Sequence, residues 1–122
     1  MNVFDASALL AFLQGEHGSD MVESELEAGG VCGAANWSET VQTILAHDRD
    51  WDLAAGLLRS YGLEVAPVTE GDAEWAGRRW RQGDGLSLGD RLCMALGERL
   101  DAKVWTADSH WGDEGRIHQI RT

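Results

Sequence analysis

The chain opens with the stretch "MNVFDASALLAF" at residues 1–12, in which a short apolar run meets one aspartate and continues, without a loop, as a second apolar run. The first run predicts a buried strand over 2–5, and the second predicts a helix over 6–14. A strand that passes directly into a helix is typical of parallel sheets covered by helices. The stretch therefore favours an α/β fold, and it leaves Asp5 at the junction of the two elements.

The rest of the chain repeats this alternation. Further strands are predicted over 29–35, 63–68, 102–108 and, at the edge of the sheet, 117–120. Further helices are predicted over 19–28, 36–48, 51–62, 69–85 and 87–100. The connections are short, so we expect one α/β domain over residues 1–122, with a mostly parallel central sheet of four to five strands flanked by helices. In the helix over 36–48, the apolar face is predicted to be Trp37, Val41, Ile44 and Leu45.

The net charge and the cysteines of the chain indicate which partners it can bind and in which cellular compartment it is expected. The net charge of −11 argues against general attraction to nucleic acid or anionic membranes, so a polyanionic substrate must be held by local cations. The two cysteines, Cys32 and Cys93, sit in apolar surroundings and predict buried free thiols in a reducing compartment, which favours the cytoplasm. No run of about 18 apolar residues and no basic segment before the first apolar stretch is present, so neither membrane spanning nor export is expected.

Four acidic residues fall where strands end and helices begin. Asp5 ends the first predicted strand, and Asp108 follows the strand residues "KVWTA". Glu39 and Asp90 lie in the first turns of the helices over 36–48 and 87–100. In parallel α/β sheets, ligands bind beyond the carboxyl ends of the strands, so these acids are expected to gather at one site.

Each of these acids, taken singly, is also explained by helix capping. "NWSE" has the form of a capping box with Asn36 at the cap and Glu39 three residues on, and "SLGD" places Ser87 and Asp90 in the same relation. Asp5 would cap the helix that follows it in the same way. For any one acid taken alone, capping is favoured over a catalytic role.

Two details favour a functional interpretation for the set. Asp90 shares a helix face with Cys93 and Gly97, whereas Arg91 and Glu98 mark the solvated side, so Asp90 is predicted to point inward. Two carboxylates ~4 Å apart at an effective dielectric constant of ~20 repel each other by about 4 kcal/mol, so converging acids need a cation or a bound proton. A divalent metal ion satisfies that need.

At these positions the sequence resembles a known family. "VFDASALLA", "NWSETVQ", "GLSLGDRLCMALGERL" and "VWTADSHW" closely resemble the motifs of PIN-domain ribonucleases, in particular the VapC-type toxins of bacterial toxin–antitoxin systems. The resemblance covers the whole chain, and the four acids come in the expected order. It implies a PIN-like fold and a metal-dependent endoribonuclease that hydrolyses RNA phosphodiester bonds.

The resemblance also implies roles for individual residues. The catalytic acids would be Asp5, Glu39, Asp90 and Asp108. Three of them would bind Mg²⁺ or Mn²⁺, namely Asp5, Asp90 and Asp108, while Glu39 would orient a water molecule or bind a second ion. The hydroxyls of Ser7 and Thr106 would hold carboxylates in place, although turn and cap chemistry explains both residues equally well.

A basic and aromatic cluster, "RRWR", stands out in this acidic chain. Arg78, Arg79 and Arg81 lie beside Trp75 and Trp80 and are candidates for RNA binding through phosphate contacts and stacking. The alternative is a solvated helix face whose tryptophans pack on the core or on a second subunit.

Two alternative functions remain at this stage. A phosphoacceptor receiver domain has an acidic pocket, but here Asp5 stands alone after its strand and the only lysine, Lys103, precedes its strand. A catalytically inactive PIN-like module that binds RNA or protein is the second, and retention of all four acids favours the enzyme. The resemblance to VapC-type toxins implies a cognate small antitoxin protein and a homodimer. We expect the antitoxin to cross the helices near 23–30 and 51–62 and to send an arginine to the acids.

Overall fold

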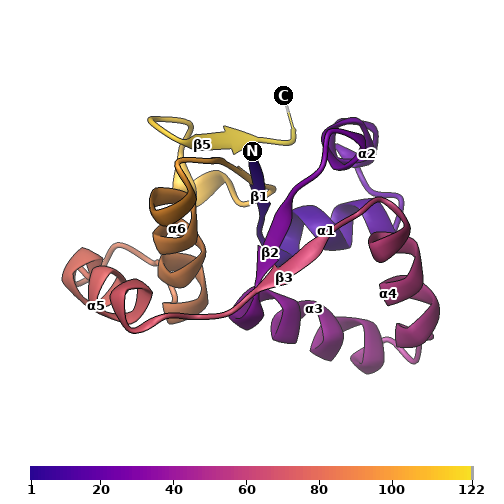
Figure 1. The fold of residues 1–122 in the computed structure, drawn as a ribbon, viewed down its shortest axis with the longest axis horizontal. Helices are drawn as coiled ribbons and strands as arrows, with labels where there is room; N and C mark the ends of the chain where they lie inside the picture. The colour runs from indigo at the N-terminus through magenta and orange to yellow at the C-terminus, as the bar shows by residue number, and fades with distance from the viewer. Residues whose placement is uncertain (122) are drawn as a thin grey trace.

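The structure, a computed structural model, describes residues 1–121 (Figure 1). Its strands are β1 (Asn2–Phe4), β2 (Val31–Gly33), β3 (Glu64–Ala66), β4 (Lys103–Thr106) and β5 (Ile117–Gln119). Its α-helices are α1 (Ala6–Leu13), α2 (Ser19–Glu27), α3 (Ala34–Ala46), α4 (Trp51–Ser60), α5 (Glu70–Arg79) and α6 (Leu88–Leu100). A short 3-10 helix, η1 (Ser109–Trp111), lies between β4 and β5.

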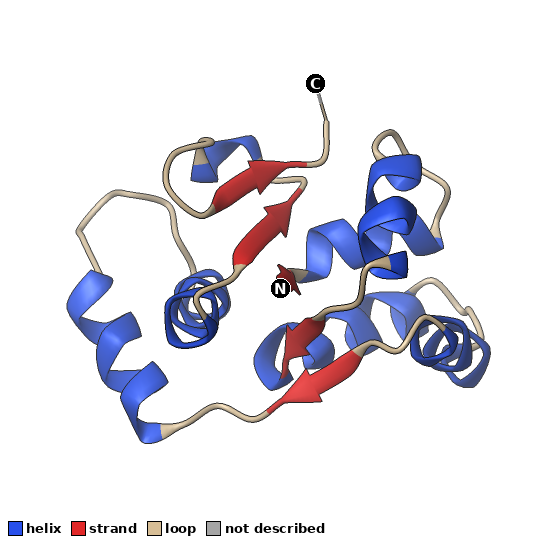
Figure 2. Ribbon diagram, turned by 45° about the horizontal axis from the view of Figure 1, so that its top comes forward, coloured by secondary structure: helices blue, strands red, loops and turns tan. Residues whose placement is uncertain are grey.

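The five strands form one sheet in the order β3-β2-β1-β4-β5, and every neighbouring pair is parallel. Helices lie on both sides of the sheet: α5 and α6 on one side, and α1, α2 and α4 on the other (Figures 1 and 2). The α/β fold with a parallel sheet predicted from the sequence is confirmed. Figure 2 also shows that β5, the strand expected at the edge, is the last strand on its side of the sheet.

Alternation along the short strands produces two apolar cores. In β1, Phe4 packs with residues of α1 and α2, while Val3 packs with Cys93 and Leu96 of α6. Successive side chains of a strand point to opposite faces of a sheet, so each face of this sheet carries its own cluster. The sheet is therefore covered on both faces, as all-parallel sheets require.

Strand order reverses next to β1. The chain moves from β1 to β2 and β3 on one side and then returns to add β4 and β5 on the other side of β1. The two strands that flank this reversal, β1 and β4, pair in register from Asn2 opposite Lys103 to Phe4 opposite Trp105. In open α/β sheets, the point at which strand order reverses is where ligands bind, beyond the carboxyl ends of the strands.

Several predicted boundaries are wrong. The second strand covers only Val31–Gly33, and α3 begins at once at Ala34, with Gly33 as its N-cap. The helix predicted over 69–85 ends at Arg79, because Trp80 adopts an extended conformation and Gly83 and Gly85 take positive φ angles of 80° and 75°. Glycine adopts such angles without a steric penalty, so the "GDG" segment forms a loop that leads into α6.

The predicted apolar face of α3 is confirmed for Ile44 and wrong for Leu45. The residues buried on α3 are Asn36, Thr40 and Ile44, while Leu45 is 55% exposed. Trp37 packs edge-to-face on Trp51 of the neighbouring helix, with ring centroids 4.9 Å apart. Trp37 therefore contacts α4, and two polar residues, Asn36 and Thr40, face the interior together with Ile44.

Two further predictions concern the cysteines and the membrane. Cys32 and Cys93 are buried free thiols, as expected from their apolar neighbours. Within residues 1–121, no helix is both long enough and apolar enough to cross a membrane.

Candidate functional site

The carboxylate of Asp5 lies at the junction of β1 and α1 and is only 4% exposed. Asp5 is the N-cap of α1, and its Oδ1 accepts a hydrogen bond from the backbone N–H of Ala8 at 2.8 Å. The Ser7 hydroxyl donates to the same oxygen at 2.8 Å, and the Thr106 hydroxyl at the end of β4 donates to Oδ2 at 2.6 Å. Each carboxylate oxygen therefore has a partner, one of them from the opposite end of the chain.

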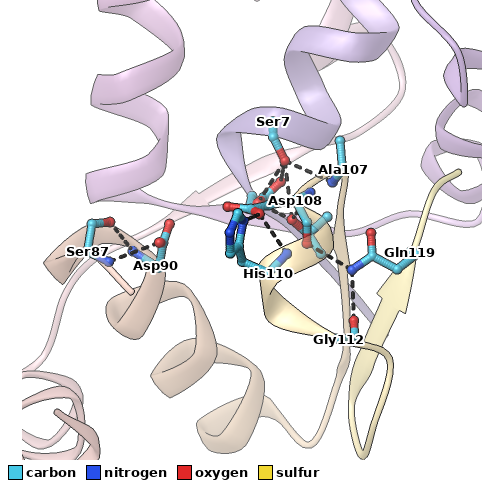
Figure 3. A network of polar contacts seen from close by, with 10 residues as sticks. Ser7, Ser87, Asp90, Ala107, Asp108, His110, Gly112 and Gln119 are labelled. Atoms are coloured by element: carbon cyan, nitrogen blue, oxygen red, sulfur yellow. Dashed lines mark hydrogen bonds and ion pairs between the residues drawn. The ribbon is translucent and has the colours of Figure 1, made fainter. Parts of the chain in front are cut away.

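The two hydroxyls that hold Asp5 also bind the segment after β4 (Figure 3). Ser7 Oγ accepts from the backbone N–H of Ala107 at 2.9 Å, and Thr106 Oγ1 accepts from the backbone N–H of Asp108 at 3.0 Å. Both hydroxyls thus donate to the carboxylate and accept from the backbone. The carboxyl ends of β1 and β4 are joined by this network.

Asp108 begins η1 and is less buried than Asp5. Its Oδ1 accepts from the backbone N–H of His110 at 2.9 Å, and the His110 ring Nδ1 lies 3.2 Å from the same oxygen. The Asp108 side chain is 40% exposed and that of His110 is 80% exposed. This acid therefore borders solvent, with an imidazole beside it.

Asp90 forms the capping box that "SLGD" predicted. The backbone N–H of Ser87 donates to Asp90 Oδ2 at 3.0 Å, and Ser87 Oγ accepts from the backbone N–H of Asp90 at 3.1 Å. In Figure 3 the Asp90 side chain is joined only to Ser87, and no hydrogen bond links it to Ser7 or Asp108. Arg91, predicted on the solvated side, instead donates from its NH1 to the backbone carbonyl of Ala76, because α5 packs on that side of α6.

Glu39 is positioned by a contact that the sequence prediction missed. Because α3 begins at Ala34, Asn36 is not a cap, and Glu39 lies in the second turn of the helix. The Asn36 side-chain amide is buried and donates to Glu39 Oε1 at 2.8 Å and to the backbone carbonyl of Gly89 at 3.2 Å. The predicted capping box at "NWSE" is therefore wrong, and its two side chains instead join α3 to the first turn of α6.

A model of the PIN-domain family matches residues 3–113. The chain belongs to the PIN-domain family. PIN domains are generally nucleases and usually use divalent metal ions. A solved structure described as a toxin-antitoxin complex from Klebsiella pneumoniae is similar, with a TM-score of 0.76, 16% sequence identity, and coverage of 98% of each chain. A search of curated protein sequences finds no match.

Burial and neighbouring negative charges raise the pKa values of two groups at this site of the PIN domain. Burial raises the pKa of Asp5 to about 6; hydrogen bonds from Thr106, Ala8 and Ser7 oppose this rise, and the charge of Asp90 adds to it. Burial also raises the pKa of the Cys93 thiol well above its usual value, and the charges of Asp5, Asp90 and Glu39 add to the rise. One buried thiol therefore lies in the field of three of the four acids.

The donor set fits a hard divalent cation, although no cluster of ligands is ready to receive one. Among the ion pairs of residues 1–121, none involves Asp5, Glu39 or Asp90. Carboxylate oxygens without a protein counter-charge are the ligands that Mg²⁺ and Mn²⁺ prefer. In the same part of the chain, no three His, Cys, Asp or Glu side chains are grouped closely enough to hold an ion. Asp90 and Glu39 are turned toward their local partners instead.

The raised pKa of Asp5 gives a prediction for the metal-free protein. The pKa is about 6 in the folded state, against an ordinary 3.8, so the folded protein binds this proton more tightly than the unfolded chain does. The contribution of Asp5 to the free energy of unfolding is thus largest below about pH 4 and is lost as the pH rises to about 6, a change of ~3 kcal/mol. Asp5→Asn should remove this loss, because the amide carries no charge.

Urea denaturation between about pH 4 and pH 7 measures the effect. Asp5→Asn should be more stable than wild type at pH 7, with the difference shrinking toward pH 4. Asp20→Asn is the matched control, because Asp20 is an exposed acid in the first turn of α2. It should keep the pH dependence of wild type. Parallel curves for wild type and Asp5→Asn would show that the Asp5 pKa is ordinary.

Proposed function

We propose that this PIN domain is a metal-dependent endoribonuclease that cleaves RNA phosphodiester bonds, acting in the cytoplasm as the toxin of a type II toxin–antitoxin system. The observation that carries the proposal is the buried, hydroxyl-bound carboxylate of Asp5 at the carboxyl end of β1, with Asp90 close enough to raise its pKa. Family membership supports nuclease activity. A toxin-antitoxin complex among similar folds supports the biological role.

The proposed metal ligands are Asp5, Asp90 and Asp108. A bound Mg²⁺ or Mn²⁺ ion would activate a water molecule and neutralise charge on the scissile phosphate. Ser7 and Thr106 would keep the Asp5 carboxylate oriented, because their hydroxyls are themselves fixed by backbone N–H groups. Asp90 would exchange its contact with the Ser87 N–H for the ion, while Glu39 would orient a water molecule or bind a second ion.

RNA would reach the acids along the loop that follows α5. Trp80 is 54% exposed at the start of this loop, which makes its indole available for base stacking. Arg78 is exposed, and the Arg81 guanidinium lies beside it, donating from NH1 to the carbonyls of Arg78 and Trp80 at 2.7 and 2.8 Å. Arg79 is paired with Asp84 at 3.2 Å, so we expect it to contribute less to phosphate binding than the other two arginines.

We propose a small cognate antitoxin and a homodimer as the partners of this chain. The expected antitoxin surface includes α2 and α4, where Met21, Leu53 and Leu57 are 39%, 72% and 44% exposed. Exposed apolar side chains on neighbouring helices can accept an amphipathic segment. Uncompensated carboxylates attract arginine, so a basic end of that segment would bind at the acidic site.

Cleavage of RNA tests the enzyme directly. With Mg²⁺ or Mn²⁺ present, wild type should cleave total cellular RNA, and Asp5→Asn and Asp90→Asn should each lower the rate by about 10²–10³-fold, because a charge that binds the ion is lost. Chelation of the metal should abolish cleavage by wild type. Asp20→Asn makes the same change in charge on α2 and should cleave normally. Normal cleavage by folded Asp5→Asn or Asp90→Asn would rule out the proposed metal site, and no cleavage by wild type would favour an inactive binding module.

Metal binding should also raise thermal stability. An ion at 100 times its Kd that binds only the folded state stabilises it by about 2.7 kcal/mol, which raises Tm by roughly 10 °C for a chain of this size. The rise should be lost when Asp5 and Asp90 are both changed to Asn. Differential scanning calorimetry with increasing Mn²⁺ measures it. An equal rise in the double variant would place the ion elsewhere.

Antitoxin binding can be separated from catalysis by a change on α4. Leu53→Asp puts a charge on a side chain that is 72% exposed, so it should weaken antitoxin binding at least about 10-fold while leaving free-enzyme cleavage unchanged. Val68→Asp, at an exposed aliphatic residue outside α2 and α4, is the matched control and should bind normally. Binding would be measured with the product of the neighbouring small reading frame.

The arginines of that product give the second arm of the experiment. Replacing its C-terminal arginines one at a time by Gln should relieve inhibition, and added Mn²⁺ should compete with the intact antitoxin. Inhibition that responds neither to those arginines nor to metal concentration would show that the antitoxin does not occupy the acidic site.

A further inference from the structure

Asn36 lies between two of the proposed catalytic elements. It is the third residue of α3, is 2% exposed, and reaches across to α6 through one amide nitrogen. That nitrogen donates to Glu39 Oε1 at 2.8 Å and to the Gly89 carbonyl at 3.2 Å. The residue after Gly89 is Asp90. The Asn36 amide thus contacts the carboxylate of Glu39 and the backbone of the residue that precedes Asp90.

Glu39 is exposed, but its carboxylate also contacts the first turn of α6. A Cβ atom added at Gly89 would lie 2.8 Å from Glu39 Oε1, closer than Cβ contacts in proteins, and 3.1 Å from Glu39 Cδ. The Glu39 carboxylate therefore rests directly against the backbone of α6, where a hydrogen atom is present instead of a methyl group. Asn36 and Gly89 define its position from two sides.

The amide oxygen of Asn36 supports a role beyond packing. Asn36 Oδ1 is buried and has no hydrogen-bond partner among the described residues. A buried acceptor without a partner destabilises a fold, so an apolar side chain of similar size would serve the interior of the protein better. The hydrogen bonds donated by the amide nitrogen explain why an asparagine is present at this position.

We propose that Asn36 is a positioning residue that holds the Glu39 carboxylate against the first turn of α6, and so sets the placement of Glu39 relative to Asp90. The proposal rests on the proposed metal-dependent nuclease function. It assigns Asn36 no contact with RNA or metal: it acts through Glu39. A donor that fixes a carboxylate in this way typically accounts for about 10–100-fold in metal affinity or activity.

A double-mutant cycle separates positioning from simple stabilisation. Asn36→Leu removes the donor at nearly constant size and should lower RNA cleavage about 10–100-fold. Its effect should be far smaller in a Glu39→Gln background, about threefold or less, because residues that act through one another are not additive. Independent losses that multiply would overturn the proposal.

Thr40→Val is the matched control on the same face of the helix. Thr40 is fully buried one turn after Asn36, and its hydroxyl bonds only the carbonyl of Asn36, at 2.8 Å. Its replacement should keep the cleavage rate of wild type. A loss equal to that of Asn36→Leu would mean that any polar change on this face disturbs the site, and would overturn the assignment.

Gly89→Ala tests the same contact if Asn36→Leu fails to fold. Alanine favours a helix, so the variant should melt at or above the Tm of wild type, yet its methyl group should displace the Glu39 carboxylate and lower cleavage about 10-fold. Wild-type cleavage by folded Gly89→Ala would contradict the proposal.

Metal-induced stabilisation gives a readout that does not depend on cleavage. The Mn²⁺ concentration that gives half of the maximal rise in Tm should increase about 10-fold or more in Asn36→Leu and Gly89→Ala and stay unchanged in Thr40→Val. If wild type binds Mn²⁺ but cleaves no RNA, the nuclease proposal fails while the shifts in midpoint still decide the role of Asn36. If wild type neither cleaves RNA nor binds Mn²⁺, both proposals fail.

Discussion

The Asp5 carboxylate is the group on which the rest of the site depends. Burying a carboxylate is costly unless its oxygens are hydrogen-bonded, and Asp5 obtains its partners from its own helix and from the Thr106 hydroxyl, 101 residues away. That requirement brings the end of β4 to the end of β1, which is also where strand order reverses. The hydroxyls that meet it also fix the backbone of Ala107 and Asp108. One buried carboxylate thus connects the carboxyl ends of β1 and β4.

Helix N-termini stabilise the carboxylates of Asp90 and Asp108, the other two acids of the proposed metal site. Asp90 is the third residue of α6 in the capping box of Ser87, and Asp108 is the N-cap of η1, so each of these carboxylates accepts a backbone N–H that would otherwise lack a partner. The capping and catalytic interpretations of these residues therefore do not exclude each other. Because the caps hold the acids in the absence of a counter-ion, the domain can fold with this excess of negative charge.

The sequence predicted those parts of the structure that depend on neighbours in the chain. The β1–Asp5–α1 junction and the capping box of Ser87 and Asp90 involve residues within three positions of each other, and both predictions are confirmed. Periodicity and the order of the motifs were enough for the parallel sheet and the family. The role of Asn36 was missed, because its partner Gly89 is 53 residues away and nothing in "NWSE" distinguishes a cap from a buried bridge.

The error in α3 has a physical cause that also concerns function. The apolar stripe that begins at Trp37 predicted the core-facing side. Ile44 is buried there, whereas Trp37 packs at the margin of the core and on Trp51, with the Arg59 guanidinium 5.5 Å from its ring. The inward face carries Asn36 and Thr40 beside Ile44, and hydrophobic periodicity does not detect the polar part of that face. The buried polar part of this face supplies the hydrogen-bond donor to Glu39, because the Asn36 amide donates to the Glu39 carboxylate from inside the fold. In this helix, Asn36, a polar residue little expected in the interior, is the one that contacts both Glu39 and α6.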